Sequence, residues 1–183
     1  AYAEKIIVVG QDVYVGGFEY GNTIELAKYW KNGTSYPIPS TANYTQAHAM
    51  AITGTDVYLA GIEYNPGSNS VAKYWKNGIS FPLTSNMNDA YSNAITVLGN
   101  DVYVAGVENG IAKYWKNGIP VILTTNRYLS NATSIILNGS DVYVAGYEFN
   151  SRSISVVKYW KNGIEVILTD GSHSSDANSI FIN

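Results

Sequence analysis

The sequence contains no cysteine and no excess of basic residues, and each absence excludes a class of function. Without cysteine the chain has no disulfide, no thiolate metal ligand and no cysteine nucleophile. The 11 Lys and Arg residues are outnumbered by 14 Asp and Glu residues, so the net charge of -3 offers no basic surface to a phosphate backbone. We therefore expect no nucleic-acid partner.

Long apolar runs are also missing. No stretch approaches the roughly 18 to 20 residues that a membrane-spanning helix needs, and residues 1–11 lack the basic start and apolar middle of a secretory signal. We expect no membrane span. Apolar residues nevertheless make up 46% of the chain, which is enough to form a folded core.

The residues of catalytic and metal sites are scarce as well. The two histidines, His48 and His173, do not have a metal-ligand spacing, and no Ser, His and Asp grouping, phosphate-binding glycine loop or zinc signature is present. Residues 170–176 contain oxygen ligands that suit Ca²⁺ but lack the full loop pattern. We expect a protein that is not an enzyme and that has no cofactor and no metal.

Tyrosine, tryptophan and glycine are abundant instead, and they recur at a fixed period. The 16 Tyr, four Trp and 17 Gly residues indicate aromatic-rich strands joined by tight turns. Two strings repeat every 40 to 45 residues. Asp-Val-Tyr begins at Asp12, Asp56, Asp101 and Asp141, and Lys-Tyr-Trp-Lys-Asn-Gly begins at Lys28, Lys73, Lys113 and Lys158. We interpret residues 1–183 as one domain with repeats at 1–43, 44–89, 90–129 and 130–176, and an extra first strand at 177–183.

Each repeat contains four predicted strands, which in the third repeat are 94–98, 102–107, 111–116 and 119–124. A Gly-x pair joins the first strand to the second, and Asn-Gly joins the third to the fourth; both are signals for two-residue hairpins. The connections from second to third strand and from fourth to first vary in length. One side of the domain is therefore uniform and the other variable.

The Asn109-Gly110 turn predicts the register of the third repeat. A two-residue loop there places Glu108 opposite Ile111, and further along it places Val104 opposite Trp115. Neither face of the resulting sheet is polar, so both faces should be covered. Proline in the fourth strand places that strand at an edge; the prolines are Pro37, Pro39, Pro82 and Pro120. Small residues in the first strand suit a crowded centre; they are Ala47, Ala49, Ala94 and Ala132.

Hairpin-linked sheets that are covered on both faces and repeat at a fixed period predict an all-β fold, a β-propeller of four-stranded antiparallel blades. The rival fold is an open β-solenoid, whose strands are parallel. The string Ala-Ile-Thr-Val-Leu-Gly-Asn-Asp-Val-Tyr-Val-Ala-Gly from Ala94 to Gly106, followed by Ala112-Lys-Tyr and Gly118, resembles the bacterial seven-bladed β-propeller repeat family. The resemblance implies a scaffold or binding module, bacterial and extracytoplasmic or secreted. The chain departs from the family in its Trp-Lys-Asn-Gly turn and in having four copies.

Five first strands accompany only four sets of the other three. Either one terminal copy is displaced, or the chain is a fragment of a larger propeller, or two chains complete a ring by exchanging terminal strands. We expect a multimeric or fragmentary propeller over a solitary four-bladed ring.

Two sets of recurrent residues are interpreted as structural. A catalytic site is not expected four times in one chain, so Glu and Lys near the second connection should form an ion pair within each blade. These pairs are Glu19 with Lys28, Glu63 with Lys73, Glu108 with Lys113, and Glu148 with Lys158. The four tryptophans are predicted to lie in the core between blades, with a surface sugar-binding role as the alternative; they are Trp30, Trp75, Trp115 and Trp160.

Ligand binding is expected on the variable side, where a rigid scaffold tolerates change. Aromatic and amide side chains there suit sugar recognition; the candidates are Tyr20, Tyr44, His48, Tyr64, Tyr91, Asn93, Tyr128 and Phe149. Of these, His48 falls near the start of a first strand, where it either lines the mouth of a central channel or ends a solvated loop. The leading hypothesis is a non-enzymatic scaffold that engages a partner protein or another copy of itself. The alternative is a carbohydrate-binding propeller with a glycan site on each blade.

Overall fold

The computed structural model describes residues 1–21, 24–125 and 128–182. All regular secondary structure within these residues is β-strand, which confirms the all-β prediction. No helix that is long and apolar enough to cross a membrane occurs in these ranges.

In the described ranges, sixteen strands form four consecutive units of four strands. Unit 1 comprises β1 (Tyr2–Val9), β2 (Asp12–Tyr20), β3 (Glu25–Lys31) and β4 (Thr34–Pro37). Unit 2 comprises β5 (Tyr44–Thr53), β6 (Asp56–Tyr64), β7 (Val71–Lys76) and β8 (Ile79–Pro82). Unit 3 comprises β9 (Ala90–Leu98), β10 (Asp101–Glu108), β11 (Ile111–Lys116) and β12 (Ile119–Ile122). Unit 4 comprises β13 (Ser130–Asn138), β14 (Asp141–Phe149), β15 (Ser155–Lys161) and β16 (Ile164–Ile167).

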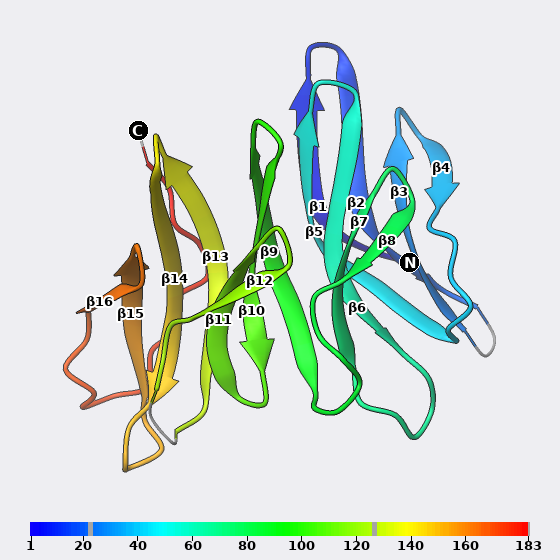
Figure 1. The fold of residues 1–183 in the computed structure, drawn as a ribbon. Helices are drawn as coiled ribbons and strands as arrows, with labels where there is room; N and C mark the ends of the chain where they lie inside the picture. The colour runs from blue at the N-terminus through cyan, green and yellow to red at the C-terminus, as the bar shows by residue number, and fades with distance from the viewer. Residues whose placement is uncertain (22–23, 126–127, 183) are drawn as a thin grey trace.

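Strands within each unit pair antiparallel in chain order, so each unit is an up-and-down sheet. Units 3 and 4 are separate four-stranded sheets, whereas units 1 and 2 are joined by one parallel pairing of Glu25 with Tyr44 into a mixed eight-stranded sheet. Figure 1 shows the units side by side in chain order, from blue (unit 1) to orange (unit 4). Antiparallel pairing within every unit is not the arrangement of a β-solenoid, whose strands pair in parallel.

The tight turns have the backbone conformation that their sequences predict. At the turn between β11 and β12, Asn117 and Gly118 both have positive φ, 51° and 81°, as a type I′ hairpin turn requires. Asn109 and Gly110 form a turn of the same kind between β10 and β11, with φ of 52° and 72°. As a result Glu108 faces Ile111, and the predicted register of these two strands is confirmed.

The first strands of the four units lie against one another, and we call β1, β5, β9 and β13 the inner strands. Each inner strand contains a bulge opposite a glycine of the second strand. In unit 3 a Cβ on Gly106 would lie 2.0 Å from the carbonyl oxygen of Tyr91, so only glycine fits beside the bulge at Asn93. The fourth strands are outermost and largely exposed, and they carry Pro37, Pro82 and Pro120.

Hydrophobic clusters fill the space between consecutive units. One cluster joins units 1 and 2, a second joins units 2 and 3, and a third joins units 3 and 4. Within unit 3, Val104 and Trp115 pack toward unit 2, whereas Tyr103 and Tyr114 pack toward unit 4. The prediction that both faces of this sheet are covered is confirmed.

Several sequence-based boundaries need correction. The fourth strand of unit 3 ends at Ile122 and not at residue 124, and Pro39 lies beyond the end of β4 at Pro37. In unit 3 the first strand begins at Ala90 and not at residue 94, because it continues past the bulge. Residues 177–182 do not form the strand expected at 177–183, since no strand of the described ranges pairs with them; Asn183 lies outside these ranges.

Candidate functional site

The cores between units define a repeated interface with two distinct halves. Each interface joins an earlier unit to the next unit along the chain. We call the surface that the later unit contributes the leading half; it consists of a valine or leucine and a tryptophan that face each other on the second and third strands of that unit. These pairs are Leu59 with Trp75, Val104 with Trp115, and Val144 with Trp160, and all six side chains are at most 1% exposed. The trailing half comes from the earlier unit and consists of a tyrosine, a small side chain and an aliphatic side chain; its members are Tyr14, Ala27 and Ile38 in unit 1, Tyr58, Ala72 and Leu83 in unit 2, and Tyr103, Ala112 and Leu123 in unit 3.

Unit 1 presents a leading half that no other unit covers. Its Val15 and Trp30 pair in the same register as the buried pairs, yet both are only half-buried. On β1, Ile6 and Val8 are each 62% exposed, although the residues at the place of Ile6 in the later units, Met50, Ile95 and Ile135, are buried. An apolar groove of about 300 Å³ lies over this face and is lined in part by Val13, Val15 and Trp30. We call this surface the unit 1 open face.

Unit 4 presents the matching trailing half, also uncovered. Leu168 is 58% exposed, and Tyr143 and Tyr159 are half-buried. The positions equivalent to Leu168 in units 1 to 3 are buried at 3%, 9% and 7% exposure; they are Ile38, Leu83 and Leu123. We call the surface of Tyr143, Tyr159 and Leu168 the unit 4 open face. The tryptophan prediction therefore describes Trp75, Trp115 and Trp160 but not Trp30.

The four predicted Glu–Lys pairs are all formed, each within its own unit. The first and last pairs differ most in burial: the Glu19 side chain of unit 1 is 51% exposed, whereas Glu148 and Lys158 of unit 4 are only 4% and 8% exposed and lie 2.5 Å apart. Burial lowers the pKa of Lys158, but hydrogen bonds to Glu148 and Glu165 outweigh it, so the net shift is upward. Each of the four lysines thus lies beside a carboxylate of its own unit.

A second set of ion pairs was missed by the sequence interpretation, although its residues lie in the repeated strings. In unit 3, Lys116 Nζ lies 2.9 Å from Asp101 Oδ2. The side chain of Asn117 donates to Asp101 Oδ1 at 2.8 Å and accepts a hydrogen bond from the amide of Val102. These bonds, first from Asn117 and then from Lys116, lower the pKa of Asp101. The same Asp, Lys and Asn arrangement closes the turns of the other units through Asp12, Lys31 and Asn32, through Asp56, Lys76 and Asn77, and through Asp141, Lys161 and Asn162.

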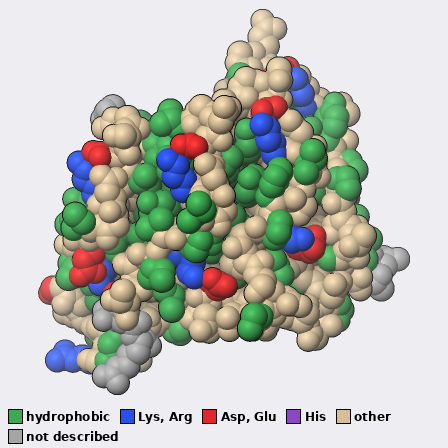
Figure 2. All heavy atoms as spheres, viewed as in Figure 1, with side chains coloured by type: hydrophobic (Ala, Val, Ile, Leu, Met, Phe, Trp, Pro, Cys, Tyr) green, Lys and Arg blue, Asp and Glu red, His purple; other side chains and the backbone are tan. Residues whose placement is uncertain are grey.

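Paired charges are visible on the molecular surface. Figure 2 shows Lys and Arg side chains beside Asp and Glu side chains across one face, with hydrophobic side chains between them. Because the charges neutralise one another locally, this face does not carry a block of one sign.

The aromatic ligand candidates form two groups on the variable-loop side. Tyr44 and Tyr64 stack with ring centroids 4.7 Å apart, and Tyr20 packs edge-on against Tyr2 at 5.4 Å. Burial and the charge of Glu25 raise the pKa of Tyr64, with smaller effects from neighbouring tyrosines. This group lies over units 1 and 2.

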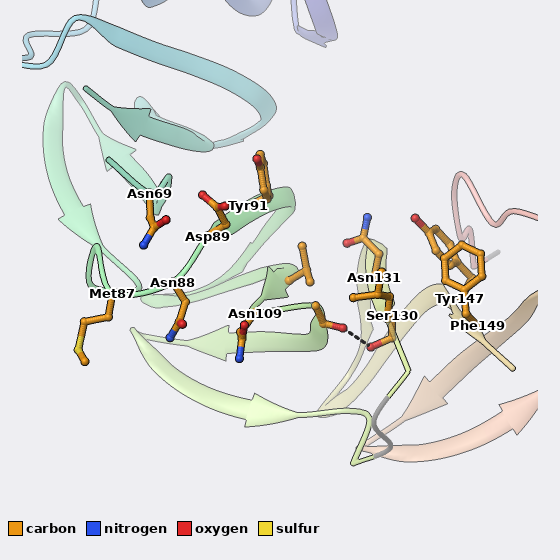
Figure 3. A pocket seen from close by; sticks show the side chains of 13 residues that line it. Asn69, Met87, Asn88, Asp89, Tyr91, Asn109, Ser130, Asn131, Tyr147 and Phe149 are labelled. Carbon is orange, nitrogen blue, oxygen red and sulfur yellow. Dashed lines mark hydrogen bonds between the residues drawn. The ribbon is translucent and has the colours of Figure 1, made fainter. Parts of the chain in front are cut away.

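The second group lies in an open cleft of about 540 Å³ over units 2 to 4. Tyr91 is 39% exposed and Phe149 half-buried, and both line the cleft. Figure 3 shows Asp89 and Tyr91 on one side, with Asn131, Tyr147 and Phe149 on the other. Tyr128 does not line this cleft but lies with Phe149 in a neighbouring one of about 430 Å³. The candidates thus do not converge on one site.

His48 and Asn93 are bulge residues of inner strands and contact the next inner strand. His48 Nδ1 lies 3.1 Å from the carbonyl oxygen of Ser92, and its Nε2 lies 3.3 Å from Gln46 Oε1. The side chain of Asn93 donates to the carbonyl oxygen of Ala132 at 2.9 Å and to Asn131 Oδ1 at 2.7 Å. Both side chains therefore bridge units.

In the described ranges, no three His, Cys, Asp or Glu side chains group where they could hold a metal ion. In the stretch 170–176, Asp170 accepts hydrogen bonds from the amide and the hydroxyl of Ser172, an arrangement that closes a local turn.

No family model matches the chain, and no curated protein matches its sequence.

Proposed function

We propose that the chain is a non-enzymatic β-propeller scaffold that associates head to tail with a second copy through its two open faces. The four units are its blades, the inner strands surround the propeller axis, and the fourth strands form the rim. Repeated antiparallel sheets that pack face to face about adjacent first strands support this architecture.

One observation carries the proposal: the unit 1 and unit 4 open faces are the two halves of an interface that the chain already forms three times. Ile6, Val15 and Trp30 form the leading half on unit 1. The residues at the same positions in units 2 to 4 are buried against the preceding unit. Tyr143 and Leu168 supply the trailing half, into which those counterparts pack. A surface whose partner surface lies at the other end of the same molecule makes a heterologous contact, and two such contacts between two copies close a ring of eight blades.

Apolar burial favours this contact. Moving an exposed side chain of the size of Ile6 or Leu168 out of water contributes about 1.5–3 kcal/mol. Each of the two interfaces in the pair of chains would bury at least Ile6, Val8, Trp30 and Leu168, which are exposed or half-buried in the single chain.

The test is the mass in solution, measured by sedimentation equilibrium over a range of concentrations. We expect a species of twice the 19.9 kDa of one chain. A monomer at every concentration would overturn the proposal, and an open series of larger species would overturn the closed ring.

Single substitutions on the two faces make the test specific. Ile6→Asp destroys the leading half and Leu168→Asp the trailing half, so each variant alone should be monomeric. When the two variants are mixed, the intact unit 4 face of the first meets the intact unit 1 face of the second, and a one-to-one complex should form. Ile119→Asp, at a side chain that is 70% exposed on an outermost strand, is the control and should associate as the unmodified chain does. If Leu168→Asp still forms a dimer, two unit 1 faces meet each other and the head-to-tail arrangement is wrong.

The cleft in Figure 3 favours a second candidate function, carbohydrate binding. Sugars are bound by aromatic rings that stack on C–H faces and by amide and carboxylate groups that bond hydroxyls, and Tyr91, Phe149, Asp89 and Asn131 place such groups around one cleft. A glycan array tests this function, with Tyr91→Ala as the variant that should lose binding. Retained binding by Tyr91→Ala, or no binding of any glycan by the unmodified chain, would reject the cleft as a sugar site.

A further inference from the structure

We infer that the position beside β13 held by residues 177–182 is the acceptor site for β1 of a second copy, and that these residues are a displaceable occupant of it. The inference rests on the proposed head-to-tail association and adds how that association is controlled.

The hydrogen bonds between inner strands place residues 177–182 at the next inner-strand position. In each case the bulge residue bonds the carbonyl oxygen of the residue just before the bulge in the following unit. His48 contacts Ser92 at 3.1 Å, and Asn93 contacts Ala132 at 2.9 Å. Thr133 Oγ1 continues the series by donating to the carbonyl oxygen of Ala177 at 2.6 Å. Ala177 therefore takes the position that the accepting residue, the one just before the bulge, would take in a fifth unit.

In a second copy the corresponding residue is Ala3, because Glu4 is the bulge residue of β1. The segments agree in pattern from there: Ala177, Ile180 and Ile182 match Ala3, Ile6 and Val8. Ile180 and Ile182 are half-buried against the chain, whereas Ile6 and Val8 are each 62% exposed. The acceptor site therefore already holds a segment with the apolar spacing of β1.

Both segments cannot occupy this position at once, and the contacts of each decide which one leaves. β1 is paired with β2 along its whole length, from Tyr2 opposite Phe18 to Val9 opposite Asp12. Residues 177–182 form no strand, and they are attached to β13 by the Thr133 bond and by a 3.3 Å bond from the amide of Ile180 to Ser134 Oγ. Release of residues 177–182 breaks fewer bonds than release of β1.

The displaced segment has a defined start. Ser175 is anchored to β15, since its amide donates to Ser155 Oγ at 3.0 Å and its carbonyl accepts from the same hydroxyl at 2.8 Å. Residues beyond Ser175 can leave without breaking this anchor. Thr133 Oγ1 then becomes free to donate to the carbonyl oxygen of Ala3 in the second copy.

The test compares the dimer dissociation constant of the full chain with that of a chain lacking residues 177–183. Removal of the segment should lower Kd by at least about tenfold, because two hydrogen bonds to the competitor no longer have to be broken at each of the two interfaces of the ring. Ile180→Asp, which weakens the occupant without shortening the chain, should lower Kd in the same direction. Phe181→Ser is the matched control, because Phe181 is 78% exposed, and it should leave Kd unchanged.

Hydrogen exchange supplies a second readout. On association, the amides of residues 177–182 should exchange faster, since they leave the acceptor site, and those of β1 should exchange more slowly. Equal Kd values for the full and shortened chains would overturn this inference and leave the proposed association standing. A higher Kd for the shortened chain, or slower exchange in residues 177–182, would mean that the segment is donated to the partner and would also overturn it. If neither chain associates, the proposed function itself fails.

Discussion

Leu168 is the exposed counterpart of Ile38. The amide of each donates a 2.9 Å hydrogen bond to the third strand of its own unit, to Val157 and Ala27 respectively, yet Ile38 is 3% exposed and Leu168 58%. The local structure is the same, and only the presence of a following unit differs.

This relationship predicts unequal costs for the same substitution. Leu123→Ala, at the equivalent buried position of unit 3, should lower the free energy of unfolding by about 2–5 kcal/mol because it opens a cavity between units 3 and 4. Leu168→Ala should change it by no more than about 0.5 kcal/mol. Urea unfolding at a concentration where the chain is monomeric measures both. Equal losses would show that the unit 4 face is covered in the single chain.

The Glu148–Lys158 pair should contribute far more to stability than its counterpart in unit 1. Glu148→Gln leaves a buried lysine without its closest carboxylate, and breaking a buried pair in this way costs about 3–5 kcal/mol. Glu19→Gln, at a side chain that is 51% exposed, should cost much less, because water screens the charges of an exposed pair. The comparison is made by thermal and urea unfolding of the two variants. A similar small loss for both would indicate that water reaches Lys158.

Stability should fall in acid through the repeated aspartates. Hydrogen bonds from Lys31 and Asn32 lower the pKa of Asp12 below 3.8, and Asp56, Asp101 and Asp141 are lowered by the equivalent residues. A carboxylate with a lowered pKa in the folded state stabilises the fold at pH values above its unfolded pKa of 3.8. That contribution is lost as the pH falls from 3.8 through the lowered values.

The measurement is the melting temperature between pH 7 and pH 2. A variant with all four aspartates replaced by asparagine should melt at a lower temperature at pH 7, and its melting temperature should change less below pH 4. Parallel curves for the two proteins would show that these aspartates do not carry the acid response.

Gly106→Ala should be strongly destabilising, because the new Cβ would lie 2.0 Å from a backbone oxygen of the neighbouring inner strand. We expect a loss of about 2 kcal/mol or more, measured by urea unfolding. Gly99→Ala is the comparison: no atom lies within 4 Å of its Cβ position, so the left-handed φ of 60° accounts for its whole cost, about 1–2 kcal/mol. A smaller loss at Gly106 than at Gly99 would mean that β10 and the bulged β9 can move apart to accept the new Cβ at little cost.

Much of the fold was predictable because turn residues and cross-strand contacts, which act over a few residues, determine it. Asn117-Gly118 and Asn109-Gly110 take the positive φ values that tight hairpins need, and the second of these turns fixes Glu108 opposite Ile111. Once the register is set, Glu108 is brought within reach of Lys113, and the pair forms at 2.6 Å. The same register, which pairs Tyr103 with Lys116, also brings Asp101 within reach of Lys116. For the sugar-site candidates the sequence predicts only that they lie on the variable-loop side. It does not predict which of them meet: Tyr91 and Phe149 share a cleft, whereas Tyr44 and Tyr64 stack elsewhere.

The sequence by itself thus determined the strands, turns, register and ion pairs within each unit, because backbone preferences and cross-strand contacts act over a few residues. The tertiary structure alone decided what each unit meets. Trp30 and Trp115 lie in two copies of one six-residue string, yet Trp115 is 1% exposed and Trp30 is half-buried. Residues 177–182 carry the pattern of an inner strand and form none. Burial and strand pairing depend on the surface that lies opposite, and only the folded chain provides or withholds that surface.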